Sequence, residues 1–525
     1  RLEPVSIATR PLQQSGVGLY LPTRMFNAEM AYLDDQHQAR PYLIEALPQL
    51  NTDTWRVNPD GTMDTTYHLR PSITWHDGQP LTAEDFAFAW RVYSTPASGN
   101  ANLTPFKFIS SVEARDLQTV VIHWKQAYAD VTFLAGQNTE FPPLPRHILE
   151  PALQTEQIDS LANNPFWTRD FVGLGPYKLD RWENGAFLEG VAFDKHVLGK
   201  AHVERVRLQF MSDARAVLAS ILSGDIHLTD GTSAGLPEIA VLKRQWISQG
   251  KGVALLHPNQ WRAAFFQFRP EYASPKGLLN PLVRKALASS LDRQPLNDAL
   301  YDGDGIISDS MFPPQSVWGA AAARGAVKYP YDARRADQLM SEAGYAKDAE
   351  GFYASPTDGR LSFEVKTNQQ SDNESEVSIL ASGWRQLGFA AQEAVLPAAQ
   401  AQDAQARATY AGLYTNSQNC CESALLGLTA ASTPRAENRW AGGNRSGWTN
   451  PGFERLIDAY SRTLDQNTRD GQIGDLVHVM TDDVQSITLF IRAQGWVHVN
   501  ELKGLDTIAP PEGNMSWNMP NWEFQ

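Results

Sequence analysis

The residues that could take part in catalysis are few and widely spaced. Gly231-Thr-Ser-Ala-Gly235 fits the G-x-S-x-G pattern, in which Ser233 would be a hydrolase nucleophile. That pattern requires an apolar strand before the serine and a helix directly after it. Here Ile226-His-Leu-Thr-Asp230 precedes the segment and Pro237 follows it closely. We therefore predict no catalytic serine.

His76 and Asp77, beside Trp75, could form a metal site or an acid–base dyad. No second histidine stands four residues from His76, and the 11 histidines show no HExxH-type spacing. We expect instead a turn at Asp77-Gly78 with His76 hydrogen-bonded nearby, and no metal site.

Adjacent carboxylates occur at Asp34-Asp35, Glu84-Asp85 and Asp482-Asp483. Glycoside hydrolysis needs two carboxyl groups about 5–10 Å apart across a cleft, which adjacency in the sequence neither shows nor excludes. We interpret the pairs as solvated faces or helix caps, and a hydrolase that uses cleft carboxylates stays open as an alternative. The phosphate-cradling patterns GxGxxG and GxxxxGK(S/T) are absent, so no nucleotide or other cofactor is indicated.

The chain has two cysteines, Cys420 and Cys421, and they are neighbours. Two cysteines cannot build a four-cysteine metal site or a long-range cross-link. A vicinal disulfide can form in an oxidising compartment but is geometrically strained. Our default interpretation is a pair of reduced or partly buried thiols, with the disulfide as the alternative.

Length and charge narrow the class of protein. At 525 residues the chain exceeds the roughly 250–300 residues at which a single core stops growing, so two or three lobes are expected. The formal charge of −14, without any Lys/Arg block, argues against nucleic acid or an anionic membrane as a partner and suits a soluble monomer. No apolar run approaches the roughly 20 residues of a membrane-spanning helix. The chain opens on Arg1-Leu-Glu-Pro, so we expect an exported protein without its signal peptide, with a lipid anchor as the alternative.

The first part of the chain alternates strand signals with turns. Asn58-Pro-Asp-Gly61 predicts a tight turn, and the alternation from Met63 to Arg70 predicts a strand. Thr82 stands before two acidic residues, a capping-box-like start of a helix whose apolar face carries Phe86 and Trp90.

The second part of the chain alternates predicted strands with predicted helices. Two apolar runs from Val253 to Phe268 predict one strand that passes through Pro258-Asn259, where we place a crossover between lobes. Helices are then predicted at 282–291, 332–344 and 374–387, and strands at 361–367 and 389–395. This alternation indicates a partly parallel sheet with helices packed on it.

Several separated segments together resemble one protein family. They are Tyr67 to Phe86, with the pattern LR…xWHDGxPLTAEDF; Val172-Gly-Leu-Gly-Pro-Tyr-Lys-Leu with Trp182 and Gly224-Asp-Ile226; Asn280 to Arg293; Tyr331 to Tyr345; and, more weakly, Asn444 to Pro451. In this order they resemble family 5 of the ABC-importer solute-binding proteins, the peptide/nickel/opine class.

The resemblance implies an α/β, two-lobed periplasmic-binding-protein-like fold (type II, cluster C). Lobe I would comprise residues 1–258 with an inserted subdomain at about 40–170, lobe II residues 259–489, and residues 490–525 would return to lobe I. The implied function is capture of a small solute, a peptide or another small organic ligand, between the lobes by hinge closure. The protein would be a periplasmic receptor rather than an enzyme, and would deliver its solute to the transmembrane subunits of an ABC permease. A chaperone-like binder is a second alternative.

The resemblance leaves the ligand open among peptide, opine, metal chelate, sugar and other solutes. Peptide-binding members typically carry a Trp-x-Ala-Asp-Tyr-like stretch late in lobe II, whose Asp pairs with the peptide ammonium. This chain has Tyr414-Thr-Asn-Ser-Gln-Asn-Cys-Cys-Glu-Ser-Ala-Leu425 there, with neither Trp nor Asp. Either Glu422 takes that role or the ligand lacks a free ammonium.

We predict the ligand contacts in this region and at three other places. Arg439 and Arg445 would bind a carboxylate, and the tryptophans would stack on the ligand. The predicted ligand-binding residues are Tyr20, Trp261, Asn419, Cys420, Cys421, Glu422, Arg439, Trp440, Arg445 and Trp448.

Overall fold

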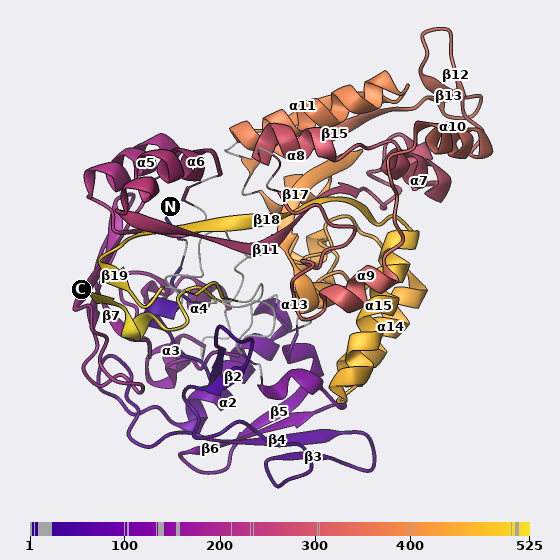
Figure 1. The fold of residues 1–525 in the computed structure, drawn as a ribbon. Coiled ribbons are helices and arrows are strands. Elements are labelled where there is room, and N and C mark those ends of the chain that lie inside the picture. The colour runs from indigo at the N-terminus through magenta and orange to yellow at the C-terminus, as the bar shows by residue number, and fades with distance from the viewer. Residues whose placement is uncertain are drawn as a thin grey trace. The chain divides into compact units, whose positions relative to one another are not determined.

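The computed structural model of the chain is mixed α/β and divides into two compact units (Figure 1). It describes residues 3–4, 6–8, 24–98, 100–101, 104–132, 134, 141–153, 158–211, 213–231, 233–234, 236–301, 303, 305–397, 400–401, 403–505, 507–509 and 514–525. Unit 1 comprises Arg1–His257, Ser461–Leu464 and Ala493–Gln525, and unit 2 comprises Pro258–Tyr460 and Asp465–Arg492. Within the described ranges, every helix is too short or too polar to serve as a membrane span.

Two long strands continue from one unit into the other. They are β11 (Gly252–Phe266) and β18 (Ser486–Val499), which are neighbours in one sheet (Figure 1). β11 confirms the prediction of a single strand through Pro258-Asn259. Each of these strands therefore contributes residues to both units.

Unit 1 contains an antiparallel sheet in the order β3 (Trp55–Val57), β4 (Met63–His68), β6 (Thr119–Trp124) and β5 (Ile109–Ala114). Along β4 the side chains of Met63, Thr65 and Tyr67 are buried and those between them are more exposed, which is the period of two expected of a half-buried strand. The Tyr67 hydroxyl donates to the carbonyl of Val131 at 3.0 Å.

Helix α2 (Ala83–Ser94) begins where the sequence predicts. The Asp85 carboxylate accepts the backbone N–H of Thr82 at 2.9 Å and that of Arg146 at 3.0 Å, so it holds the first turn of α2 against the start of α3 (Arg146–Leu153). Phe86 is fully buried on the core side of the helix. The segment with the strongest family pattern thus forms a strand, a turn and a helix start.

Unit 1 contains further helices and strands outside this sheet. They are β1 (Ala31–Leu33), β2 (Ala39–Pro41), α4 (Ile158–Ala162), β7 (Tyr177–Glu183), β8 (Phe187–Ala192), β9 (Arg205–Gln209), α5 (Ala214–Ser223), β10 (Leu228–Thr229), α6 (Leu236–Gln245), β19 (Leu502–Lys503) and β20 (Glu523–Phe524).

Unit 2 is built on a sheet in which β11 is followed by β17 (Leu413–Asn419), β15 (Ser362–Asn368) and β16 (Ala390–Leu396). β15 runs parallel to both β16 and β17, which confirms the predicted partly parallel sheet. The helix predicted at 374–387 is α11 (Ser371–Gln386), one turn longer at its start, and it packs along β15 and β16 (Figure 1).

The two faces of this sheet carry separate hydrophobic cores. Ala264 and Phe266 of β11 pack on the α11 face, whereas Trp261, Ala263 and Phe265 pack on the other face, here called the α15 face. The α15 face is covered by α9 (Gly319–Gly325), α14 (Pro451–Arg462) and α15 (Gln466–Asp482). Period-two alternation along one strand therefore supplies both cores.

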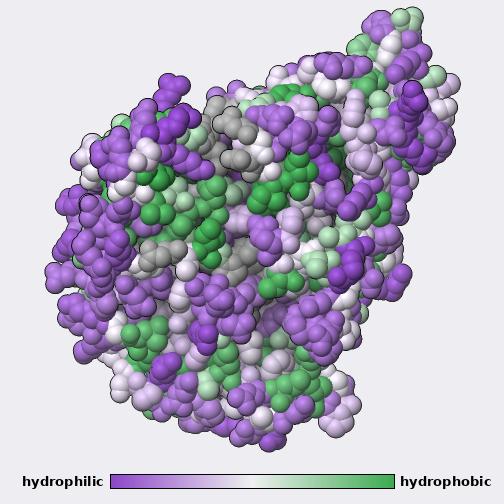
Figure 2. Space-filling view, viewed as in Figure 1, coloured by the Kyte–Doolittle hydropathy of each residue, from purple (hydrophilic) through white to green (hydrophobic). Residues whose placement is uncertain are grey.

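The remaining elements of unit 2 are α7 (Pro281–Ser289), α8 (Gln294–Tyr301), α10 (Ala333–Glu342), β12 (Ala346–Lys347), β13 (Tyr353–Ser355), β14 (Gly359–Arg360), α12 (Ala404–Ala408) and α13 (Cys421–Leu426). Asp332 caps α10 through the backbone N–H of Arg335, as its position in the sequence predicts. On the face shown in Figure 2, hydrophilic side chains predominate around α10, β12 and β13.

Candidate functional site

The candidate site lies on unit 2, around β17 and the chain on either side of it. Tyr410, before the strand, and Tyr414, within it, pack on the α15 face with ring centroids 5.4 Å apart. The Tyr410 hydroxyl donates to the carbonyl of Phe266 at 3.0 Å, and the Tyr414 hydroxyl donates to Oδ1 of Asn368 at 2.6 Å. Both side chains are 1% exposed, so the two rings form part of the core beneath the site, and both hydroxyl donors are used within the fold.

Cys420 and Cys421 follow β17 and are joined by a vicinal disulfide. Our default interpretation of two reduced thiols is wrong in this structure, because their sulfur atoms are bonded to each other. The side chains are 2% and 0% exposed and pack with Leu425 and Trp448, so a solute would reach little of their surface in this conformation. Cys421 has φ +77°, a left-handed conformation that is unfavourable for a residue with a Cβ atom.

Glu422 lies in the first turn of α13 and already has polar partners. Its Oε1 accepts hydrogen bonds from the Arg469 guanidinium and from the Tyr460 hydroxyl. The Arg469 guanidinium carbon also lies 4.4 Å from the centre of the Tyr460 ring. Glu422 is thus part of an ion-paired group, and a ligand ammonium would have to compete with Arg469 for it.

The predicted tryptophans differ in exposure. Trp261 and Trp448 are each 1% exposed and lie in the core of the α15 face. The indole N–H of Trp261 donates to Oγ1 of Thr488 at 3.0 Å, and that of Trp448 donates to Oδ2 of Asp483 at 2.7 Å. Trp440 is half-buried and has a left-handed backbone, φ +62°.

The other predicted contacts lie near the ends of β17 and in the segment after α13. Asn419 is half-buried and pairs with Gln260 of β11. Arg439 is exposed and has φ +53°. Tyr20 lies outside the described residues. The contact roles of all ten residues stay predictions.

Arg445 lies beside a second arginine, Arg407, which sequence reasoning missed. Burial and then the positive charge of Arg407 lower the pKa of the Arg445 guanidinium to about 10. Burial also lowers the pKa of Arg407. Both side chains are half-buried. The only available signal in the sequence was a single cation within the Ala- and Gln-rich stretch at 398–408.

A third arginine fixes the segments that carry this pair. The guanidinium of Arg269 donates to the carbonyl of Ala408 at the end of α12 and, at 2.9 Å, to the carbonyl of Arg445. Gly447, with φ +66°, lies against the Arg269 side chain, and a Cβ atom there would stand 2.5 Å from Cγ of Arg269. Arg269 therefore joins the two segments by their backbones and leaves the side chains of Arg407 and Arg445 for other contacts.

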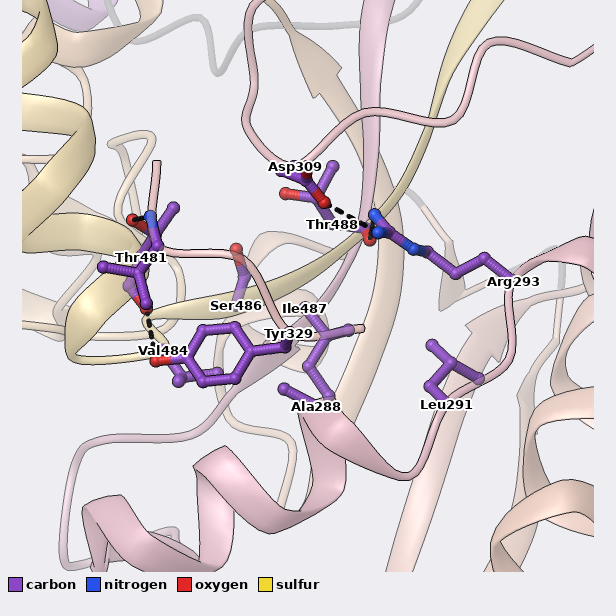
Figure 3. A pocket seen from close by; sticks show the side chains of 11 residues that line it. Ala288, Leu291, Arg293, Asp309, Tyr329, Thr481, Val484, Ser486, Ile487 and Thr488 are labelled. Atoms are coloured by element: carbon purple, nitrogen blue, oxygen red, sulfur yellow. Dashed lines mark hydrogen bonds and ion pairs between the residues drawn. The ribbon is translucent and has the colours of Figure 1, made fainter. Parts of the chain in front are cut away.

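Unit 2 also contains a small cavity elsewhere, between the ends of α7 and α15 and the start of β18 (Figure 3). Figure 3 shows Arg293 directed toward Asp309, with which it forms an ion pair at 2.7 Å, and Tyr329 directed toward Thr481, whose carbonyl it contacts at 3.1 Å. The cavity volume is about 40 Å³, which suits a few water molecules rather than a peptide. None of the predicted contact residues lines it.

The candidate catalytic groups have structural partners. The Ser233 hydroxyl donates to Oδ1 of Asp230 at 2.6 Å, and no histidine contacts it among the described residues. His76 accepts the Gly173 N–H at Nδ1, 3.2 Å, and Nε2 lies 2.9 Å from the Gly175 carbonyl. The expected turn with a hydrogen-bonded His76 is confirmed, and Gly78 has φ +90° there. In the described ranges, no three His, Cys, Asp or Glu side chains are grouped so that they could hold a metal ion.

The sequence is similar to a family of bacterial binding proteins. A family model described as bacterial extracellular solute-binding proteins, family 5 Middle, matches residues 45–419. The oligopeptide-binding protein AppA of Bacillus subtilis is 25% identical over 322 residues, which is 61% of this chain and 56% of that protein. The chain thus spans about half the length of the curated relatives it matches.

Two solved structures are similar over almost the whole chain. NikZ from Campylobacter jejuni, in complex with Ni(L-His), has a TM-score of 0.82 at 19% identity, covering 99% of this chain and 97% of that one. The oligopeptide-binding protein from Thermus thermophilus, complexed with a pentapeptide, has a TM-score of 0.79 at 20% identity, covering 97% and 92%. The expected two-lobed periplasmic-binding-protein fold is confirmed.

Proposed function

The chain belongs to family 5 of the bacterial extracellular solute-binding proteins, and on that premise we propose that it is the solute-binding component of an ABC importer. The observation that carries the proposal is the family match over residues 45–419, in a chain whose fold agrees along nearly its whole length with solute-binding proteins. The family consists of binding proteins of transporters. We propose that this chain, too, captures and releases its solute unchanged and passes it to a membrane permease.

We propose that unit 1 corresponds to lobe I and unit 2 to lobe II, with the predicted boundaries near 258 and 490. The strands β11 and β18 support this proposal, because each continues between the units and could bend as a hinge. We further propose that the mature protein is periplasmic and monomeric, consistent with its net charge of −14.

The alternative hydrolase has less support. Ser233 donates its hydrogen bond to an aspartate rather than to a histidine, and His76 is held by backbone groups. Of the predicted contacts, we propose Arg439, which is exposed, and Asn419, Trp440 and Arg445, which are half-buried, as the ones most available to a solute.

Thermal unfolding in the presence of candidate solutes, followed by recovery of the solute, tests this function. A receptor should be stabilised by one class of solute, by about 2.7 kcal/mol at a free concentration 100-fold above Kd, and should return it chemically intact. Small-angle scattering should show a smaller radius of gyration with that solute present. A cleaved product, or no stabilisation by peptides, metal chelates, carboxylates or sugars, would contradict the receptor function.

A further inference from the structure

Among the described residues, no carboxylate forms an ion pair with the guanidinium group of Arg407 or that of Arg445. Neither forms a hydrogen bond or an ion pair with another residue in the part of the chain that the structure describes, and Nε of Arg407 is buried without an acceptor. Elsewhere in unit 2, Arg262, Arg284, Arg293 and Arg469 each pair with a carboxylate. Two adjacent, partly buried cations without an anion are an unfavourable arrangement that an anionic ligand would relieve.

The acidic residue nearest to Arg407 in the sequence is Asp403, and its carboxylate binds backbone N–H groups. Asp403 caps α12, and its Oδ1 accepts the N–H groups of Gln405 at 2.9 Å and Ala406 at 3.1 Å. The phenol groups of Tyr410 and Tyr414 are kept neutral, because burial raises the pKa of both hydroxyls. Among the described residues, Asp403 acts on Arg407 only through its field, and the two tyrosines near the arginines are neutral, so neither arginine has a paired counter-ion there.

A further hydrogen-bond donor lies on the same face of the sheet. Asn368 accepts the Tyr414 hydroxyl at Oδ1, and its Nδ2 group has no acceptor among the described residues. Asn368 is half-buried at the end of β15. Two guanidinium groups and one amide thus supply donors for which the described residues provide no acceptor, above the buried rings of Tyr410 and Tyr414. This is the donor set that a carboxylate requires.

We propose that Arg407 and Arg445 together bind the carboxylate of the transported solute, so that the ligand class of this receptor is small carboxylate-bearing molecules. The assignment rests on the proposed receptor function and specifies its chemistry. It also fits Glu422, whose carboxylate is already paired with Arg469 and is therefore poorly placed to serve as the main anchor of a ligand ammonium. The carboxylate, and not an ammonium, is then the group by which unit 2 orients its solute.

Native mass spectrometry of the full chain tests this assignment with four probe mixtures. They are random peptides of two to five residues without Asp or Glu and with free C-terminal carboxylates, the same peptides as C-terminal amides, small di- and tricarboxylates, and neutral sugars. The variants are Arg407→Gln and Arg445→Gln. Arg324→Gln, an exposed arginine of α9 that makes the same change in net charge, is the matched control.

We expect the wild type and Arg324→Gln to retain carboxylate-bearing probes and to reject the amides. Each of the two test variants should retain the same probes at least tenfold more weakly, since loss of one charged partner from such a contact removes at least that factor. Circular dichroism and thermal unfolding establish that both variants are folded. Acid-selective retention that only these two substitutions abolish supports the proposal.

Other outcomes overturn it in distinguishable ways. Equal retention of peptide acids and amides, or retention of neutral sugars alone, would contradict the carboxylate assignment and leave the receptor function standing. Unchanged retention of an acid by both folded variants would also contradict it. If no mixture yields a retained solute, the proposed receptor function itself fails, and the assignment fails with it.

Discussion

Arg262 and Arg445 lie on opposite faces of the unit 2 sheet and meet very different surroundings. The guanidinium of Arg262 is on the α11 face, where it donates to both carboxylate oxygens of Glu376, at 2.7 and 2.9 Å, and to Thr415 at 3.1 Å. Arg445 is near the α15 face beside another cation, Arg407. The donors of Arg262 are therefore used within the fold, whereas the guanidinium of Arg445 has donors to which the described residues offer no acceptor.

The pKa values of the two groups differ in direction. Burial opposes the charge of Arg262, but the charge and hydrogen bonds of Glu376 outweigh it and raise the pKa above its ordinary value. For Arg445 burial acts in the same direction as the neighbouring cation, and the pKa falls to about 10. Arg262 thus carries its own counter-ion and Arg269 is held by carbonyl oxygens, whereas no acceptor for the guanidinium of Arg445 is found among the described residues.

The largest expected effect comes from removing the counter-ion of Arg262. The substitution Glu376→Ala should lower the free energy of unfolding of unit 2 by about 3–5 kcal/mol, because it leaves a guanidinium that is 4% exposed without its counter-ion. Urea-induced unfolding followed by tryptophan fluorescence measures the loss. The double variant Arg262→Met/Glu376→Leu should be less destabilised than Glu376→Ala. A loss below about 1 kcal/mol in Glu376→Ala would show that Arg262 does not depend on Glu376 as its counter-ion.

His76 in unit 1 is a second buried group whose hydrogen bonds are made within the fold. Its two partners, the N–H of Gly173 and the carbonyl of Gly175, suit only the neutral ring. Burial lowers the pKa of His76 to about 4, against an ordinary value of about 6.5. The folded state thus disfavours the charged ring, so stability is present above about pH 6.5 and is lost as the pH falls toward 4. The expected loss from this group is about 3 kcal/mol over that range.

Urea unfolding between pH 7 and 4 measures this slope. His196 has a pKa lowered to about 4 by the same cause, so His76→Asn should remove only part of the pH dependence. His478→Gln, at an exposed position in unit 2, is the control and should leave the slope unchanged. A His76→Asn protein with the full wild-type slope would mean that His76 does not contribute.

Glu422 tests an intermediate case, a carboxylate that holds one arginine against one aromatic ring. Glu422→Gln keeps the shape of the side chain but removes the charge that faces Arg469. We expect a loss of about 1–3 kcal/mol, because the hydrogen bonds weaken while Arg469 keeps its contact with the Tyr460 ring. Glu437→Gln, on an exposed turn of the same unit, should change stability by less than about 0.5 kcal/mol. Equal thermal unfolding of the two variants would place Glu422 outside the ion-paired group.

The sequence predicts elements that depend on local patterns better than it predicts the site. The strand at β4, the start of α2 at Thr82 and the single strand β11 follow from alternation and capping, which act within a few residues. The parallel pairing of β15 with β16 and β17 follows from the order of strands and helices along the chain.

The site depends on contacts that no local pattern encodes. Arg407 and Arg445 are 38 positions apart in the sequence, and they are neighbours because Arg269, itself far from both, binds the backbone of each segment. The burial of Trp261 and Trp448 likewise follows from the helices that cover the α15 face. The disulfide of Cys420 and Cys421 depends on a left-handed backbone at Cys421, which its residue type does not favour.

The smallest expected effect on stability comes from removing the charge of Arg445, and this substitution distinguishes most clearly between the two faces of the sheet. Arg445→Met keeps most of the length and the apolar surface of the side chain and removes its charge. Because the wild-type guanidinium is partly buried without a counter-ion, we expect the free energy of unfolding to stay within about 1 kcal/mol of wild type or to rise. Arg407→Met should behave in the same way. In the double variant, the second substitution should raise the free energy of unfolding less than it does alone, since the repulsion between the two cations is already gone after the first. Urea unfolding of the four proteins gives this cycle directly. A loss comparable to that of Glu376→Ala would show that Arg445 is held by partners within the fold, and the distinction between the two faces of the sheet would fail.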